Sequence, residues 1–216
     1  MPIAHPLTMW SPPPAPDSPA PDRVRGALSG SLLFAQPRHA AVVSAITTFC
    51  APPGPVVFEV GFDHGMRILS CARAWPDVRW LGAEIRKRRV EAASPHAPTN
   101  CLLLHADART LLATVIPAGT LAQVDVLFPT PTDTPRHLLL TPMFALAVAR
   151  SLAPDGTIHL ATDVREMAEL FRCTFEGWVD AAHPAAAPEL SRRERVCRRD
   201  GLAIHRVTLR RPEDQP

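Results

Sequence analysis

The sequence contains no apolar run that approaches the roughly 20 residues needed to cross a bilayer. Its start lacks the basic residues and apolar stretch of a secretion signal. The five cysteines never form a Cys-x-x-Cys pair, and the nine histidines show no metal-ligand spacing. These absences argue against a disulfide framework and a zinc site. They predict a cytoplasmic protein with reduced thiols, no metal and no membrane association.

Lysine is almost missing, because Lys87 is the only one and arginine carries nearly all the positive charge. A net charge of +2 neither requires nor excludes a nucleic-acid partner. Two arginine-rich clusters stand out, at residues 86–89 and 192–199. Each predicts either a solvated surface or a contact with phosphate groups, which guanidinium binds bidentately.

The chain of 216 residues is long enough for one domain with a full core. Residues 1–37 open with a proline-rich stretch without apolar periodicity, which predicts a disordered or extended arm. Residues 38–216 form the predicted single domain. There, strands and helices alternate, which predicts an α/β fold with a doubly wound, mostly parallel sheet of about seven strands and helices on both faces.

Apolar patterns give the positions of these elements. Strands are expected at Val56–Val60, Arg79–Glu84, Cys101–His105, Val124–Phe128, Thr157–Ala161 and, antiparallel, Leu202–Arg210. Helices are expected at Arg38–Phe49, Gly65–Trp75, Arg86–Ala93, Ala108–Val115, Pro142–Leu152 and Val164–Trp178. Asp155-Gly156 is expected to end the helix before the fifth strand, and His183–Arg199 to be irregular.

The segment VVFEVGFDHG, residues 56–65, predicts a buried strand followed by a glycine loop. Gly61 allows a tight turn with positive φ, and Gly65 allows the next helix to pack closely. The spacing Glu-x-Gly-x-x-x-Gly differs from the dinucleotide pattern Gly-x-Gly-x-x-Gly, and Glu59 and Asp63 would repel a pyrophosphate. A nucleotide-like ligand with positive charge suits this loop better, and S-adenosylmethionine carries an ammonium and a sulfonium.

Three acids fall at the carboxyl ends of the first three expected strands: Glu59, Glu84 and Asp107. The carboxyl ends of parallel strands surround the ligand crevice of an open sheet. Glu84 lies 23 residues after Gly61, the distance at which an acid binds ribose hydroxyls. Asp107 and the following Ala108 would then flank the adenine. Alternatively, each acid caps the next helix, as Asp107 could do.

Six segments carry a resemblance to a known family. They are FEVGFDHG (58–65), WLGAEIR (80–86), HADA (105–108), VLFPTP (126–131), HLATDVREMAELF (159–171) and SRRERVCRRDG (191–201). In turn they are similar to Leu-Glu-Ile-Gly-Phe-Gly-x-Gly, Gly-Ile-Glu, Asp-Ala, Phe-Phe-Pro-Asp-Pro-Trp, His-Met-Ala-Thr-Asp and Thr-x-Phe-Glu-x-x-Gly. Over residues 56–211 the chain therefore resembles the tRNA (guanine-N7) methyltransferases, which are class I S-adenosylmethionine-dependent enzymes.

The resemblance implies methyl transfer from S-adenosylmethionine to N7 of a guanine in tRNA, by a monomer or small homo-oligomer. It implies that Asp163 takes the guanine edge, assisted by Ser191 and Glu194, and that Thr130 stands at the catalytic position of the Pro-Asp-Pro segment. Asp163 could instead cap the helix that begins at Val164. Further substrate contacts are implied for Thr134, Arg136 and His137.

The chain departs from the family pattern at several positions. Asp63 replaces the central glycine of the loop, and Thr130-Pro131-Thr132 replaces Asp-Pro-Trp. Leu138-Leu139-Leu140 replaces a basic run. Two alternatives therefore stand beside the first interpretation: a methyltransferase for another RNA or a small molecule, and a catalytically weakened RNA-binding protein. Packing of the leucines in the core would make the charge loss structural, whereas exposure would indicate a new partner surface.

Overall fold

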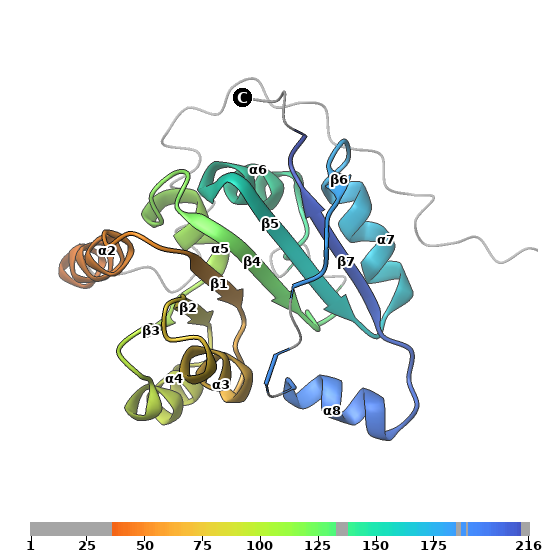
Figure 1. The fold of residues 1–216 in the computed structure, drawn as a ribbon, viewed down its shortest axis with the longest axis horizontal. Helices are drawn as coiled ribbons and strands as arrows, with labels where there is room; N and C mark the ends of the chain where they lie inside the picture. Colours follow the sequence, from red (N-terminus) through yellow and green to blue (C-terminus); the bar gives the residue numbers. More distant parts are fainter. Residues whose placement is uncertain (1–35, 133–137, 185–186, 189, 213–216) are drawn as a thin grey trace, which may run out of the picture. The chain divides into compact units, whose positions relative to one another are not determined.

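A seven-stranded sheet organises residues 36–132, 138–184, 187–188 and 190–212, which the computed structural model describes (Figure 1). Its strand order is β3-β2-β1-β4-β5-β7-β6. The strands are β1 Val56–Val60, β2 Arg79–Glu84, β3 Cys101–His105, β4 Leu121–Leu127, β5 Leu152–Thr162, β6 Val179–Asp180 and β7 His205–Arg210. Strands β1 to β5 pair in parallel, whereas β7 runs antiparallel to both β5 and β6. The predicted fold class and the antiparallel last strand are confirmed.

Helices cover both faces of this sheet. They are α2 Gln36–Cys50, α3 Met66–Ala74, α4 Lys87–Ala93, α5 Ala108–Thr110, α6 Pro142–Ser151, α7 Arg165–Thr174 and α8 Arg192–Arg199, with the short helices η2 Ser94–His96 and η3 Leu111–Val115. One apolar core joins α3 and α4 to the sheet, and a larger one joins α2, α5, η3, α6 and α7 to it. Helix α2 begins two residues before the predicted domain boundary, and residues 1–35 of the predicted arm lie outside the described residues.

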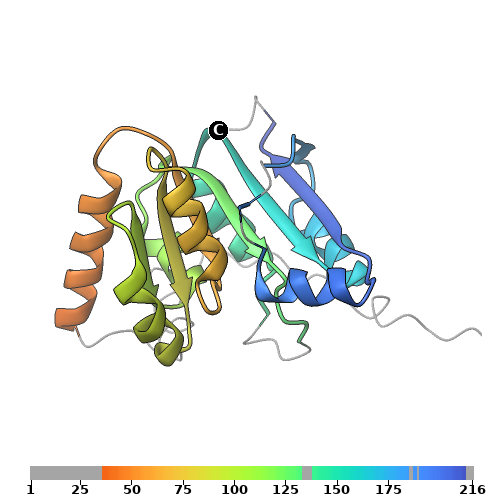
Figure 2. The same ribbon diagram turned by 60° about the horizontal axis from the view of Figure 1, so that its bottom comes forward.

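Strands β1, β2 and β3 occupy the predicted ranges. Their side chains are mostly buried on both faces, because helices lie on each side of a parallel sheet. All three end at the same edge of the sheet, which is also the edge where α8 lies (Figures 1 and 2). The carboxyl edge of the sheet is therefore where the sequence motifs meet.

The prediction that Asp155-Gly156 ends a helix is wrong. Helix α6 ends at Ser151, and β5 runs through both residues. A Cβ at Gly156 would lie 2.8 Å from the carbonyl oxygen of Leu121, beside the register shift between β4 and β5. The glycine is thus required by close backbone approach at a bulge.

The prediction of an irregular segment up to Arg199 is also wrong, because residues 192–199 form α8. The hydroxyl of Ser191 accepts the backbone N–H of Glu194 at 3.2 Å and caps this helix. Helix α7 ends at Thr174 rather than Trp178, before a turn at Gly177 with φ 83° and the unpredicted β6.

Within these described ranges, no helix is long and apolar enough to cross a membrane. The same part of the chain shows no group of three His, Cys, Asp or Glu side chains that could hold a metal ion. All five cysteines are free thiols.

Candidate functional site at the carboxyl edge of the sheet

The glycine loop connects β1 to α3. Gly61 has φ 71° and donates its N–H to the carbonyl of Ala83 at 2.8 Å, and nothing lies within 4 Å of where its Cβ would be. Gly65 has φ 77°, and its Cβ would lie 3.0 Å from that of Ala93 in α4. The predicted tight turn at Gly61 is confirmed, whereas the atom nearest to a Cβ at Gly65 belongs to α4 rather than to the next helix, α3. Asp63, at the family's glycine position, also has a positive φ, 53°.

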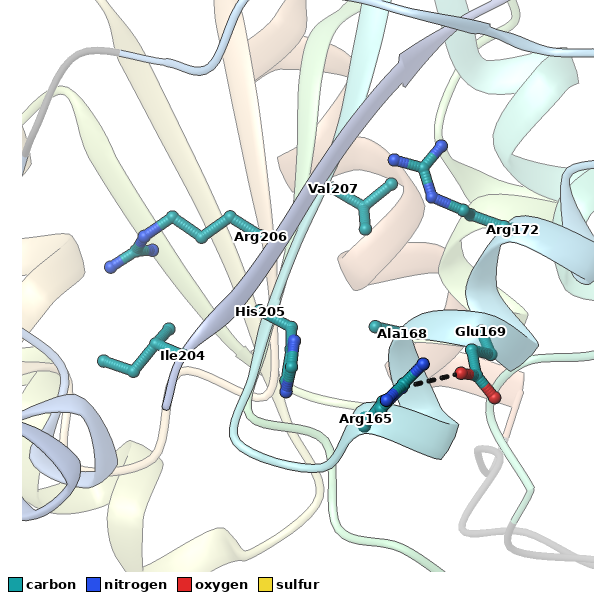
Figure 3. Close-up of a pocket in the computed structure, with 8 residues that line it drawn as sticks. All are labelled: Arg165, Ala168, Glu169, Arg172, Ile204, His205, Arg206 and Val207. Atoms are coloured by element: carbon teal, nitrogen blue, oxygen red, sulfur yellow. Dashed lines mark hydrogen bonds and ion pairs between the residues drawn. The ribbon is translucent and has the colours of Figure 1, made fainter. Parts of the chain in front are cut away.

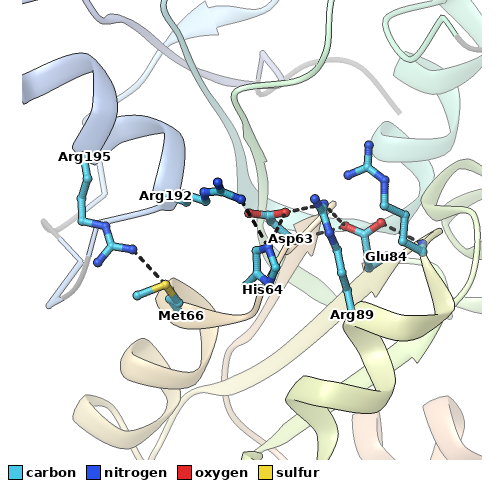
Figure 4. Close-up of polar contacts among 8 residues, drawn as sticks. Asp63, His64, Met66, Glu84, Arg89, Arg192 and Arg195 are labelled. Carbon is cyan, nitrogen blue, oxygen red and sulfur yellow. Dashed lines mark hydrogen bonds and ion pairs between the residues drawn. The ribbon is translucent and has the colours of Figure 1, made fainter. Parts of the chain in front are cut away.

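Asp63 and Glu84 form one charged cluster with Arg89 (Figure 4). Glu84 accepts the backbone N–H of Asp63 at 3.2 Å and that of Arg86 at 2.9 Å. Arg89 forms an ion pair with Asp63 and lies 3.6 Å from Glu84. The acid at the tip of β2 is therefore tied directly to the glycine loop.

Glu59 takes part in a separate, buried network. Arg67 of α3 donates from Nη1 to Glu59 and from Nη2 to Asp125 of β4, each at 2.7 Å. Burial raises the pKa of Glu59 above its usual value, although Arg67 opposes this. Burial lowers the pKa of Arg67, but Asp125 and Glu59 outweigh it, so that this pKa is raised. One guanidinium therefore serves two buried carboxylates.

This network belongs to a buried polar row across four strands. Glu59 pairs in register with Asp125, Asp125 with His159, and His159 with Thr208. The Nδ1 of His159 lies 2.8 Å from the Thr208 hydroxyl, and burial lowers the pKa of His159 to about 4. Sequence reasoning missed Arg67 and Asp125. The signal for Asp125 was a single acid inside an apolar strand.

Asp107 caps α5, as the alternative interpretation proposed. Its carboxylate accepts the backbone N–H of Arg109 at 2.9 Å and pairs with the Arg109 guanidinium at 2.5 Å. Ala108 is the first residue of α5 and is buried. Of the three predicted acids, only Glu84 accepts a hydrogen bond from the glycine loop, while Glu59 pairs with Arg67 and Asp107 pairs with Arg109.

A backbone hydrogen bond joins the carboxyl ends of β4 and β5. Phe128 has φ 48°, an unusual value for a bulky residue, and donates its N–H to the carbonyl of Ala161 at 2.6 Å. Thr130, two residues farther, is exposed. Strain of this kind is typical of functional segments, and it occurs here in the Phe-Pro-x-Pro motif.

Asp163 follows β5 and does not cap α7. The hydroxyl of Thr162 accepts the backbone N–H of Val164 at 3.1 Å instead. The side chain of Asp163 is 14% exposed and forms an ion pair with Arg193 of α8. This hydrogen bond lowers the pKa of Asp163 below its usual value. Asp163 is thus an ionised carboxylate at the carboxyl edge.

Helix α8 contacts both the residue after β5 and the glycine-loop region. Arg192 lies 3.5 Å from the ring of His64, and Arg195 donates to the sulfur of Met66 at 2.9 Å (Figure 4). Glu194 is buried and accepts from Arg206 of β7 at 2.5 Å. Ser191 and Glu194 therefore cap and anchor this helix. The predicted substrate contacts Thr134, Arg136 and His137 lie outside the described residues.

A cleft of about 430 Å³ lies between α7 and β7 (Figure 3). Arg165 and Arg172 line it, but they pair with Glu169 and Asp180, each at 3.0 Å. Glycine-loop residues do not line this cleft.

Comparisons with known proteins identify the family. A family model described as "Putative methyltransferase" matches residues 53–182. The tRNA (guanine-N(7)-)-methyltransferase of Treponema pallidum (strain Nichols) is 34% identical over 181 residues, which are 76% of this chain and 69% of the relative. The chain belongs to the tRNA (guanine-N7) methyltransferase family.

Other family members match over a shorter part. The tRNA (guanine-N(7)-)-methyltransferase of Buchnera aphidicola subsp. Acyrthosiphon pisum (strain Tuc7) is 32% identical over 116 residues, or 50% of this chain and 48% of the relative. The chain thus spans about half the length of the first curated relatives it matches. The fold is also that of a 16S rRNA (adenine(1408)-N(1))-methyltransferase from Catenulisporales acidiphilia, with TM-score 0.55, 13% identity, and 77% and 92% of the two chains covered.

Proposed function

We propose that this protein transfers the methyl group of S-adenosylmethionine to N7 of a guanine in tRNA, as a cytoplasmic monomer or small homo-oligomer. The hydrogen bond from Phe128 to the carbonyl of Ala161 is the observation that carries this proposal. It joins the two most specific family motifs, Phe-Pro-x-Pro and Ala-Thr-Asp, at the edge where the glycine loop lies. The segments proposed to bind the guanine and the loop proposed to bind the methyl donor thus lie at one edge of the sheet.

The residues at the glycine loop fit S-adenosylmethionine. Open space adjoins Gly61, and Glu84 lies at the tip of β2. Glu59, Asp63, Glu84 and Asp125 lie at or beneath the loop and pair with Arg67 and Arg89, while Arg192 and Arg195 of α8 contact His64 and Met66. The carboxylates at the base of the loop favour a cationic ligand. When bound, S-adenosylmethionine supplies an electrophilic methyl group.

Separate roles follow for the predicted cofactor residues. Glu84 would bind the ribose hydroxyls, with Arg89 moving aside from it, and Asp107 and Ala108 would border the adenine. Gly61 and Gly65 shape the loop. Glu59 would favour the cofactor's positive charge without touching the cofactor. Its carboxylate bonds to Arg67 and contributes negative charge beneath the loop.

The proposed reaction needs no general base, since guanine N7 has a lone pair and no proton. The protein must align N7 with the methyl carbon at about 3–3.5 Å. It must also tolerate the positive charge that develops on the purine, for which a carboxylate is suited. Asp163 would take the guanine edge, and the exposed Thr130 would offer a hydroxyl. Ser191 and Glu194 would act by holding α8 in place.

The leucine run favours this proposal over the alternatives. Leu140 is 2% exposed in the larger core, and Leu139 packs against that core. Leu138 accepts a hydrogen bond from Arg109 through its backbone carbonyl at 3.3 Å. Leu139 and Leu140 therefore serve packing, and their apolar character does not indicate a new partner surface. The predicted tRNA contacts at Thr134, Arg136 and His137 remain part of the proposal.

Incubation with methyl-labelled S-adenosylmethionine and tRNA lacking N7-methylguanosine tests this function. The expected result is label in tRNA at one guanosine, mapped by strand cleavage at N7-methylguanosine. Ribosomal RNA at equal nucleotide concentration is the control. Label in ribosomal RNA instead of tRNA, or in neither with S-adenosylmethionine bound, would overturn the proposal.

A further inference from the structure

The side chain of Asp163 does not cap α7, and its carboxylate forms an ion pair with a guanidinium instead. The Thr162 hydroxyl accepts the backbone N–H of Val164, so the start of α7 does not need the Asp163 side chain. Nη2 of Arg193 donates to Oδ2 of Asp163 in a charge-assisted hydrogen bond. The side chain of Arg193 is 49% exposed, whereas that of Asp163 is 14% exposed. A half-exposed side chain thus pairs with a mostly buried carboxylate.

The position of α8 does not depend on this ion pair. Glu194 is buried and accepts from Arg206 and Arg198, and Cys197 is fully buried. At the other side of the helix, Arg195 contacts Met66. Arg193 can therefore leave Asp163 while α8 stays in place.

A guanidinium and the Watson–Crick edge of guanine present the same groups to a carboxylate. Guanine offers N1–H and the exocyclic N2–H side by side, in one plane, as arginine offers its N–H donors. Bases that are splayed out of RNA are commonly bound through this edge. A carboxylate that accepts Arg193 is therefore shaped to accept guanine.

We propose that Arg193 is a built-in competitor of the target guanine: it occupies Asp163 until the base enters and displaces it. This inference rests on the proposed function, because it takes Asp163 as the acceptor of the guanine edge. Arg193 keeps Asp163 ionised and oriented between turnovers. It also selects for bases with two adjacent N–H donors, because these can give the carboxylate one hydrogen bond more than the single one that Arg193 donates.

Binding of free nucleosides tests this competition without any methyl transfer. Guanosine and inosine, which lacks the N2 amino group, are titrated by NMR against the full chain and its Arg193→Ala variant. If Asp163 is occupied most of the time, freeing it should tighten guanosine binding by about five- to tenfold, because apparent affinity scales with the fraction of competent protein. Inosine binding should change less, and Asp163→Asn should abolish the gain in the double variant.

Arg199→Ala is the matched control, because it removes the same charge from the same helix at a residue that is paired with Asp200. It should leave guanosine affinity unchanged. Unchanged or weaker guanosine binding in Arg193→Ala would overturn the inference, as would an equal gain in Arg199→Ala. These outcomes are independent of the proposed function, which fails instead if the unaltered protein binds S-adenosylmethionine but does not methylate tRNA.

Discussion

The guanidinium of Arg67 lies 2.7 Å from the carboxylate of Glu59, beneath the glycine loop. Both side chains are less than one-tenth exposed. The same guanidinium also holds Asp125, whose side chain is fully buried. Charges in such surroundings are tolerated only when they are paired and hydrogen-bonded. The two buried carboxylates beneath the glycine loop therefore depend on a single arginine for their ion pairs.

Replacing Arg67 by methionine should strongly destabilise the fold. The change leaves Glu59 and Asp125 on neighbouring strands without their shared cation, and loss of one partner of a buried ion pair costs about 3–5 kcal/mol. The free energy of unfolding, measured by denaturant titration, checks this. Arg73→Met on the exposed side of α3 is the control and should cost less than about 1 kcal/mol. Equal losses in the two variants would show that Arg67 has no special role.

Gly61→Ala should weaken binding of S-adenosylmethionine. Gly61 and Gly119 have φ 71° and 68°, and neither has a neighbour within 4 Å of a built Cβ. Alanine at either position should therefore cost a similar ~1–2 kcal/mol of stability through the left-handed backbone. Only at Gly61 would the new methyl enter the proposed cofactor space. Calorimetry should show a loss of affinity of about tenfold, equal to 1.4 kcal/mol, for Gly61→Ala alone; similar affinities in both variants would remove Gly61 from the site.

His159 should make stability depend on pH. Burial lowers its pKa from 6.5 to about 4 in the folded state. Between these values the unfolded chain binds the additional proton, so the free energy of unfolding should decrease as pH falls from 6.5 to 4, by about 3 kcal/mol at most. His159→Gln should flatten this part of the profile, whereas exposed His96→Gln should leave it unchanged. If the free energy of unfolding of His159→Gln fell with pH as steeply as that of the unaltered protein, His159 would not be the group that takes up the proton on unfolding.

Asp163→Ala should separate chemistry from cofactor binding. Because Asp163 is proposed to touch the guanine, kcat on tRNA should fall by about a hundredfold, the scale for loss of one preorganised active-site group. S-adenosylmethionine affinity, measured by calorimetry, should be retained. Asp180→Ala, an exposed acid on β6, is the control for lost negative charge. Undiminished turnover in Asp163→Ala would exclude this carboxylate from the reaction.

The parts of the fold that follow from local patterns were predictable. Strands β1 to β3 are mostly apolar segments bounded by turns, and Gly61 has the predicted positive φ. The bulge at Gly156 was not predictable, because the contact that requires a glycine there comes from Leu121, far away in the sequence.

Helix α8 was missed because it has almost no apolar face. Its buried positions include Glu194 and Cys197, and ion pairs with distant residues such as Arg206 hold it in place. The signal that was available is the Ser-x-x-Glu capping pattern at Ser191 and Glu194. Likewise, no local pattern shows that Arg67 reaches Asp125 across the sheet, so the sequence located the site but not its internal ion pairs.

The identity of the methyl-accepting atom tests the central claim most directly. Two tRNA transcripts would be compared, one with guanosine and one with 7-deazaguanosine at the mapped position, where a C–H group replaces N7. We expect methyl transfer to the guanosine transcript alone, with both transcripts bound equally well, because the lone pair of N7 is the proposed nucleophile. Equal methylation of the two transcripts would place the methyl group on another atom and contradict the account.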